Sequence, residues 1–246
     1  MALITVNGIV TRYANYRDND RILTLFTRER GLISAAARGC RRPKSQLLPA
    51  SELFVSGEFV LFLNREKYTV ESCDVREPFY PLREDVERFS AGAYMLSLIN
   101  EGTAAEQPNE ALLSLLLYAL SFTAYSECAP LDMALCFAAR CLQTLGYSPA
   151  VTRCAACGCD LRAARELHFS AAAGGALCSA CTHGFGTDAV PISALSLEAL
   201  RRMLMLPDVE MGRVRLPERV RNELKHAVNG YAEHVLERRF KALSCL

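Results

Sequence analysis

The chain has 246 residues, of which 51% are hydrophobic, and this is typical of a globular protein with one to three compact domains. Its formal net charge of +1 excludes a polycationic, histone-like binder of nucleic acids. No apolar run approaches the ~18 residues of a membrane span and no basic leader precedes an apolar stretch, so we expect a cytoplasmic protein.

Residues 3–75 carry the signals of β-strands, with alternating apolar residues between turn residues such as Asp18, Asn19 and Gly31. Five short strands in so small a segment predict a closed barrel over residues 1–79. An oligonucleotide-binding (OB) fold is the first interpretation and an SH3-like barrel the alternative. The expected strands cover residues 6–12, 22–27, 32–37, 53–63 and 68–75.

A basic loop follows the third expected strand. Residues 38–45 read Arg-Gly-Cys-Arg-Arg-Pro-Lys-Ser, with four cations and no acidic residue. On the rim of a barrel such a loop suits contacts with backbone phosphates, and the alternative is a solvated loop without a partner. Tyr13, Tyr16 and Tyr68 are weaker candidates for stacking on bases, because barrel aromatics usually fill the core. The candidate nucleic-acid-binding residues are Arg38, Arg41, Arg42 and Lys44, with Arg28 and Arg30 extending the same surface.

Beyond Pro78 the apolar residues recur at spacings of three and four, which predicts helices over residues 80–150 and 188–246. Residues 81–150 contain three Lys or Arg against eight Asp or Glu, so this part is acidic. Prolines in first turns and a terminal glycine mark the helix ends. The expected helices cover 86–99, 108–125, 130–146, 197–206 with Ser196 as N-cap, and 217–243.

Two cysteine pairs interrupt the helical region, in Cys154-Ala-Ala-Cys157 and Cys178-Ser-Ala-Cys181. Twenty residues separate Cys157 from Cys178. Two C-x2-C pairs at this separation are typical of a structural Zn²⁺ site, in which four thiolates fill the tetrahedral shell. A closed shell leaves no position for a water or a substrate, so the ion is expected to hold structure. We expect a metal module over residues 151–187, inserted in the helical domain, with Gly158 at positive φ after the first pair.

The chain contains eleven cysteines, so free thiols, disulfides or a Cys-x-x-Cys redox site are the alternatives to a metal. Cys159, His168 and His183 are second-choice ligands, because each breaks the symmetry of the pairs. The seven cysteines outside the pairs are predicted to fill the core: Cys40, Cys73, Cys128, Cys136, Cys141, Cys159 and Cys245.

No nucleophile elbow, phosphate-cradling loop or zinc-hydrolase helix occurs in the sequence. The four histidines, including His226 and His234, show no arrangement of catalytic partners. We therefore expect no catalytic residues and no small-molecule substrate. The odd number of cysteines fits a reducing compartment, where paired thiols bind metal.

Several segments, in their order and spacing, make the chain resemble the RecO family of bacterial recombination mediators over nearly its whole length. They are Asn7–Val10, Tyr16–Thr27, Gly31, Ala36–Ser45, Leu145–Tyr147, the two cysteine pairs and Arg238–Leu243. The resemblance implies an α+β protein with an N-terminal OB barrel, a helical domain and an inserted zinc module. It also places Arg38, Arg41, Arg42 and Lys44 at the family's basic loop, with Arg38 where lysine is common and Cys40 where alanine is usual.

The resemblance further implies a non-enzymatic mediator of DNA repair and homologous recombination in the bacterial cytoplasm, associated with the nucleoid. Such proteins bind single- and double-stranded DNA, anneal strands covered by single-strand binding protein, and with RecR help RecA replace that protein at gaps. Many relatives carry an acidic residue where this chain has Ala138, before Arg140, so binding of the acidic tail of single-strand binding protein stays open. The alternative from another class is an RNA-binding or ribosome-associated zinc protein.

Overall fold

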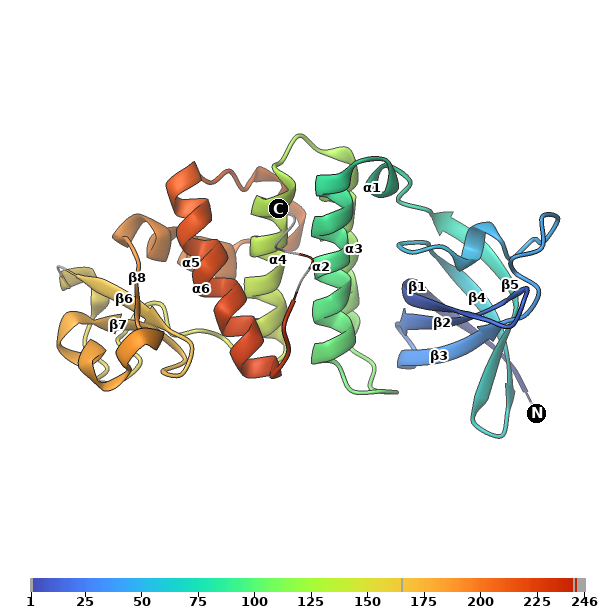
Figure 1. Ribbon diagram of the computed structural model, residues 1–246, viewed down its shortest axis with the longest axis horizontal. Coiled ribbons are helices and arrows are strands. Elements are labelled where there is room, and N and C mark those ends of the chain that lie inside the picture. The colour runs from blue at the N-terminus through green and yellow to red at the C-terminus, as the bar shows by residue number, and fades with distance from the viewer. Residues whose placement is uncertain (1, 165, 241, 243–246) are drawn as a thin grey trace.

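The computed structural model describes residues 2–164, 166–240 and 242, and it has the expected α+β architecture. A β-barrel, a layer of helices and a small sheet follow one another along the longest axis (Figure 1). Among the described residues, no helix combines the length and the apolar character needed to cross a membrane. Cys245 and the end of the expected last helix lie outside the described residues.

Five strands form the barrel, which closes in the order β1-β2-β3-β5-β4. β3 pairs with β5 in parallel, whereas the other neighbours are antiparallel. This connectivity is that of an OB fold, which confirms the first interpretation over the SH3-like alternative. The strands are β1 (Ala2–Tyr16), β2 (Asp20–Thr27), β3 (Gly31–Ala37), β4 (Ser56–Asn64) and β5 (Lys67–Glu77).

The fourth strand begins at Ser56, three residues later than expected, because Phe54 has a φ of +71°, which no strand residue adopts. The turn directs Phe54 out of the barrel and toward the helices. Its ring is fully buried and meets the ring of Phe89 edge to face, at 5.7 Å between centroids. An apolar residue that seemed to extend a strand therefore joins the barrel to the helical layer.

Six α-helices form the helical layer: α1 (Pro81–Glu84), α2 (Val86–Gly102), α3 (Glu110–Tyr125), α4 (Pro130–Thr144), α5 (Ala194–Met205) and α6 (Glu218–Leu236). Helix starts follow ordinary capping rules, since the Asp85 carboxylate accepts from Arg88 N at 2.8 Å and the Asn109 side chain accepts from Leu112 N at 3.0 Å. The prediction that Ser196 is the N-cap of α5 is wrong. Ser193 caps α5, because Ser196 is buried and donates to Glu223 at 2.7 Å.

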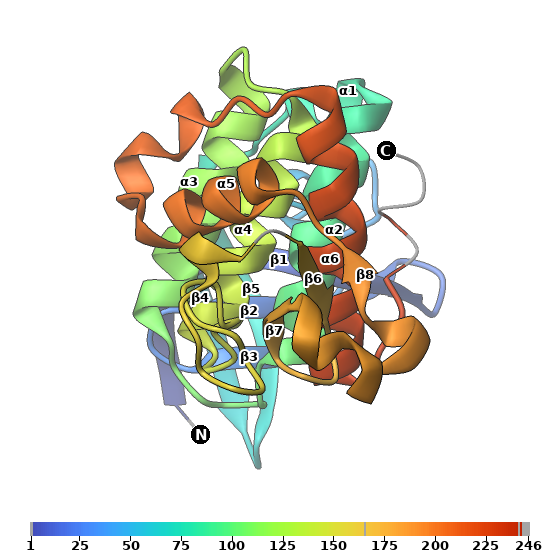
Figure 2. The ribbon, with the colours of Figure 1, turned by 90° about the vertical axis from the view of Figure 1, so that its left-hand side faces the viewer.

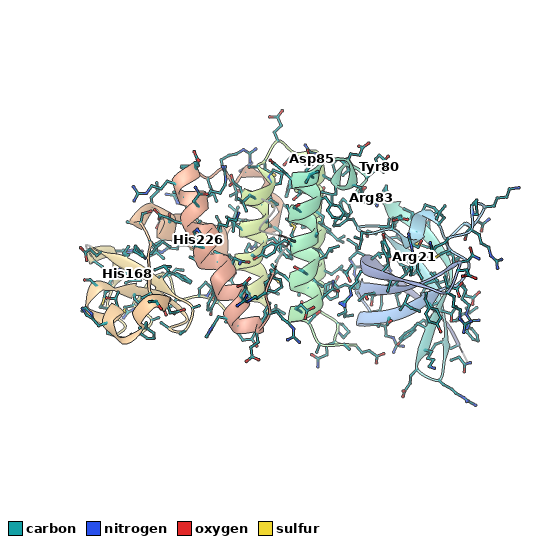
Figure 3. The ribbon with its side chains drawn as sticks, in the orientation of Figure 1. Arg21, Tyr80, Arg83, Asp85, His168 and His226 are labelled. Atoms are coloured by element: carbon teal, nitrogen blue, oxygen red, sulfur yellow. The ribbon has the colours of Figure 1, made fainter. Side chains whose placement is uncertain are left out.

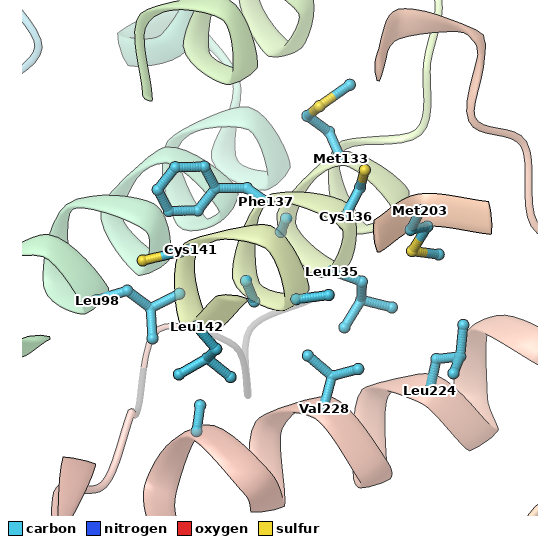
Figure 4. Packing of buried hydrophobic residues seen from close by; sticks show 14 of the residues in the cluster. Leu98, Met133, Leu135, Cys136, Phe137, Cys141, Leu142, Met203, Leu224 and Val228 are labelled. Carbon is cyan, nitrogen blue, oxygen red and sulfur yellow. The ribbon is translucent and has the colours of Figure 1, made fainter. Parts of the chain in front are cut away.

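Helix α4 is the centre of this layer, and its residues 132–139 are all buried. Leu135 and Leu142 point toward Val228 of α6, while Cys141 points to the other side, toward Leu98 of α2 (Figure 4). α6 ends at Leu236, earlier than expected, because Glu237 adopts the left-handed conformation of a helix C-cap. A helix buried on all sides needs neighbours on all sides, which explains the apolar character of α4.

The remaining sheet has the order β7-β6-β8 and lies beside α6, on the side away from the barrel (Figure 2). Its strands are β6 (Leu167–Ser170), β7 (Gly175–Cys178) and β8 (Val190–Pro191), so it reaches past residue 187. Phe169 is buried and meets Tyr231 of α6 edge to face at 5.9 Å. The short 3-10 helices are η1 (Pro49–Ser51), η2 (Leu161–Ala163), η3 (Ser179–Gly184), η4 (Gly186–Asp188) and η5 (Asp208–Arg213).

Polar contacts fix the barrel on α2. The Thr11 hydroxyl donates to Asn100 Oδ1 at 2.7 Å, and the Arg83 guanidinium donates to Leu53 O at 2.7 Å. Arg83 lies between α1 and the barrel in Figure 3. Tyr68 is buried and donates to Glu106 at 3.3 Å, so it fills the core and is not free to stack on a base.

Candidate metal centre and nucleic-acid interface

Four thiols come together between the two cysteine-bearing turns of the metal module. The sulfur atoms of Cys154, Cys157, Cys159 and Cys178 lie within 4.8 Å of one another. Three of these cysteines belong to the expected set, and Cys159 is the second-choice ligand. The prediction that Cys159 fills the core is wrong, because this residue is exposed.

Cys181, the fourth expected ligand, adjoins the same cluster. Cys178 is the N-cap of η3 and Cys181 is its third residue, and the side chains at these two positions of a helix lie near each other. The thiols of Cys157, Cys178 and Cys154 raise the pKa of Cys181, which agrees with this proximity. We call these five thiols the thiol cluster.

Backbone geometry builds the first turn of the cluster. Gly158 N donates to Cys154 O and Cys154 N donates to Cys159 O, both at 2.9 Å. Gly158 has a φ of +74°, as expected, and a Cβ there would meet nothing within 4 Å. The glycine is thus required by its backbone conformation and not by crowding.

The same turn stabilises thiolates. Burial raises the pKa of Cys154, but N–H groups of Cys157, Cys178 and Ala156 outweigh this and hold the pKa at about 6. The backbone N–H of Cys159 likewise lowers the pKa of Cys157. Hydrogen bonds with Cys157 and Cys178 raise the pKa of Cys159 and of Cys181 to about 12.

The spacing of the sulfur atoms fits a tetrahedral ion. Zn–S bonds of about 2.3 Å place the sulfurs of a tetrahedron about 3.8 Å apart. Cys157 Sγ and Cys178 Sγ are 3.8 Å apart, far beyond the ~2.05 Å of a disulfide. All described cysteines are free, so the disulfide alternative finds no support among them.

The two histidines proposed as second-choice ligands lie outside the thiol cluster, and most of the cysteines predicted to fill the core are buried. Among the described residues, the group of potential ligands that comes together contains neither His168 nor His183. His168 on β6 and His226 on α6 lie on different elements in Figure 3. The core prediction is confirmed for Cys40, Cys128, Cys136 and Cys141, which are buried, while Cys73 is half-buried.

At the far end of the barrel, the basic loop (residues 38–45) exposes Arg38, Arg41, Arg42 and Lys44. It is nevertheless ordered, because Cys40 is fully buried in the barrel core. Successive turns join Arg42 N to Gly39 O at 3.1 Å and Ser45 N to Arg42 O at 2.9 Å. Four cations are thus held in a defined array without an acidic partner in the loop.

The β1–β2 turn anchors the loop. Gly39 N donates to the Asp20 carboxylate at 2.7 Å, and Arg41 N donates to Asn19 O at 3.1 Å. The Arg41 guanidinium donates to Asp18 O at 3.2 Å. The turn and the loop therefore form one surface on the barrel rim.

Arg21, which the sequence analysis did not single out, fastens the segment that follows the loop. Its guanidinium donates to Ser51 O and to the Glu52 carboxylate, each at 2.8 Å (Figure 3). It also lies 4.1 Å from the ring centroid of Tyr13. Tyr16 is 49% exposed beside this rim, with the Arg17 guanidinium 5.2 Å from its ring centroid, so it is the tyrosine of the three with exposed ring surface for a base. The sequence indicated this role only through the position of Arg21 at the start of a strand, after a polar turn.

Arg28 and Arg30 do not extend this surface, which corrects the expectation. The β2–β3 ladder pairs Arg21 with Ala37 at the loop end and Thr27 with Gly31 at the other end. Six residues of strand separate the two ends by about 20 Å. Arg28 pairs instead with Glu110 of α3 at 3.3 Å.

The three cations of residues 81–150 each have a partner within the protein. Arg83 and Arg88 donate to the backbone oxygens of Leu53 and Ala124, and Arg140 pairs with Asp208 of η5. Asp208 is distant in sequence from Arg140, so the residue spacing within α4 does not predict this ion pair. Position 138, an alanine in this chain, supplies no acidic partner for Arg140, and Asp208 of η5 supplies it instead.

Comparison with known proteins agrees with this architecture. Family models described as Recombination protein O N terminal and Recombination protein O C terminal match residues 1–79 and 83–244. Proteins named DNA repair protein RecO from Acetivibrio thermocellus and Pelotomaculum thermopropionicum are each 35% identical to the chain, over 99% and 100% of it and 96% and 94% of their own lengths. The protein of the same name from Symbiobacterium thermophilum is 33% identical over 98% of the chain and 96% of its own length. The chain belongs to the RecO family of DNA repair proteins.

Proposed function

We propose that the protein binds single- and double-stranded DNA with its barrel and anneals complementary strands. With RecR, it helps RecA to replace single-strand binding protein at gaps. The observation that carries this proposal is the ordered, exposed array of Arg38, Arg41, Arg42 and Lys44 on an OB barrel of a RecO-family chain.

Contacts with phosphates provide the affinity in this proposal. Arginine presents a planar fork that suits phosphate oxygens. The hydrogen bonds that Gly39 N and Arg41 N donate to the Asp20 carboxylate and to Asn19 O fix the backbone next to Arg38 and at Arg41. An array that is ordered before binding loses little conformational entropy when a strand arrives. Tyr16 adds an exposed ring for stacking, which tolerates any base.

No covalent bond is made or broken in the proposed work, which takes place in the bacterial cytoplasm at the nucleoid. The cations present charge and not acid or base chemistry. Single-strand binding protein is a partner through the DNA that it covers. Arg83, Arg88 and Arg140 each have a partner within the protein, so these three residues offer its acidic tail no unpaired cation.

Zn²⁺ is the ion that we assign to the thiol cluster, since four thiolates are its preferred structural ligands and four sulfurs here lie within 4.8 Å of one another. Cys154, Cys157 and Cys178, with a fourth thiolate from the same cluster, would hold it. The closed shell supplies structure to the two turns and no site for a substrate.

Annealing of complementary strands tests the function. We expect the protein to accelerate annealing of strands that are coated with single-strand binding protein, and to act more strongly on DNA than on structured RNA. The double variant Arg41→Glu/Arg42→Glu should lose most of the acceleration, since repulsion replaces two phosphate contacts.

The matched control reverses two exposed charges on the helical layer, in Arg202→Glu/Arg213→Glu. It changes the net charge equally and should anneal like the unaltered protein. Failure of the unaltered, folded protein to accelerate annealing, or equal loss in both double variants, would contradict the proposal.

A further inference from the structure

We propose that Cys159 and Cys181 are interchangeable fourth ligands of the metal centre. The ion is then held by Cys154, Cys157 and Cys178 together with either of the two other thiols. This inference rests on the proposed metal site. It adds that the site contains one thiol more than the ion requires.

The position of Cys159 in the cluster follows from the first turn. Its sulfur lies within 4.8 Å of the sulfurs of Cys154, Cys157 and Cys178. The hydrogen bond from Cys154 N to Cys159 O, at 2.9 Å, returns the chain to the cluster after Gly158. Cys159 is therefore placed as a ligand although it lies outside the paired C-x2-C spacing.

Cys181 reaches the same point from the second turn. Cys178 is the N-cap of η3 and Cys181 is its third residue, and side chains at these two positions lie near each other. The second C-x2-C pair thus brings Cys181 to the cluster from the turn that carries Cys178. The two candidates for the fourth position therefore come from opposite turns.

A tetrahedral shell accepts four sulfurs, so five thiols cannot all bind one zinc ion. Cys154 and Cys178 are buried, whereas Cys157 and Cys159 are exposed and Cys181 is half-buried. Both candidates for the fourth position are therefore accessible to solvent. If one thiolate left a bound ion, it would take up the proton that the entering thiol releases, and the total charge would stay constant.

Cobalt substitution tests the inference on the full-length chain. The variants are Cys159→Ser, Cys181→Ser and the double variant, each stripped of metal and titrated with Co²⁺ against a competing chelator. The absorption bands of a four-thiolate Co²⁺ site should persist in both single variants, with affinity within about threefold of the unaltered protein. The double variant should lose the four-thiolate spectrum and more than about 100-fold in affinity, since even partners that only hydrogen-bond a ligand contribute about 10–100-fold.

Cys157→Ser/Cys159→Ser is the matched control, because it leaves three thiols in the cluster, as the Cys159→Ser/Cys181→Ser variant does. It should behave like that variant. If Cys181→Ser alone loses as much as the Cys159→Ser/Cys181→Ser variant while Cys159→Ser has no effect, or the reverse, the inference is wrong and the metal site stands. If the unaltered protein binds no Co²⁺, both fail.

Alkylation gives a second measurement that does not depend on refolding. Iodoacetamide applied to the zinc-loaded, unaltered protein should add one group to the cluster, divided between Cys159 and Cys181. Mass mapping should find Cys154, Cys157 and Cys178 protected. Modification confined to one of the two candidates would overturn the proposal.

Discussion

Glu223 illustrates how a single carboxylate ties two helices of the helical layer together. It lies on α6 and accepts hydrogen bonds from the Ser193 backbone N–H at 2.8 Å and the Ser196 hydroxyl at 2.7 Å, both at the start of α5. Arg219 donates to it at 2.9 Å. Burial alone would raise its pKa, but these hydrogen bonds from Ser193, Ser196 and Arg219 lower the pKa to about 2.

The lowered pKa predicts an acid-dependent contribution to stability. A carboxylate whose folded-state pKa lies below its unfolded value stabilises the protein above the unfolded pKa, here 4.5, and the stabilisation disappears as pH falls toward 2. Glu223→Gln should therefore lower the free energy of unfolding at pH 7 by about 1–2 kcal/mol, a value reduced for the solvent that still reaches the side chain. The difference from the unaltered protein should shrink between pH 4.5 and pH 2.

Urea unfolding at pH 7 and at pH 3 checks this expectation. Glu218→Gln is the matched control, because Glu218 lies exposed on the same helix. A loss of stability that is the same for Glu223→Gln at both pH values would show that packing of the glutamine, and not the charge, is responsible.

At the scale of elements, the basic loop depends on the β1–β2 turn for its shape. The Asp20 carboxylate receives Gly39 N, while the side chain of the nearby Asp18 is exposed and its backbone oxygen accepts from Arg41. Removal of either acid makes the rim more positive. Simple Coulomb attraction therefore predicts tighter DNA binding for both changes.

The structure predicts a different result for the two acids. Asp20→Ala should weaken binding of single-stranded DNA by about threefold to tenfold, because the loss of a hydrogen bond of about 1 kcal/mol loosens the loop and outweighs the removal of one negative charge. Asp18→Ala should leave the affinity equal or increase it. Fluorescence anisotropy at constant salt measures both, and equal gains in affinity would show that order in the loop is unimportant.

The two functional regions differ in how far sequence predicts them. The C-x2-C spacing and Gly158 predict the position of the metal module, because a knuckle is a local structure. The C-x2-C pattern does not predict Cys159 as a member of the cluster. Its thiol comes close to the others because the hydrogen bond from Cys154 N to Cys159 O turns the chain back. The composition of residues 38–45 predicts a basic loop. It does not predict that Asp20 and Arg21 hold the loop and the segment after it, because these contacts form only when β2 pairs with β3.

The whole molecule separates the proposed DNA-binding rim from the metal module by the helical layer (Figure 1). Periodicity predicts five strands and the main helices, because each period reports burial on one face. It does not predict the turn at Phe54 or the pairing of Arg140 with Asp208, since both depend on contacts between elements that are distant in sequence. Within the described residues, the apolar core of the helices also includes Phe169 and Leu177 of the small sheet.

Under the proposed function, affinity for DNA belongs to one end of the molecule. Reversal of charge in the basic loop should weaken DNA binding, whereas the same reversal on the helical layer should have little effect on DNA binding. The binding should be strongly dependent on salt, because each neutralised phosphate releases counterions.

The most direct measurement of this claim is the equilibrium affinity for single-stranded DNA as a function of salt concentration. If Arg38, Arg41, Arg42 and Lys44 neutralise about four phosphates, the slope of log affinity against log salt should be about −3, and Arg41→Glu/Arg42→Glu should reduce its magnitude by about half or more. A slope near zero for the unaltered protein, or an unchanged slope in the double variant, would contradict the account.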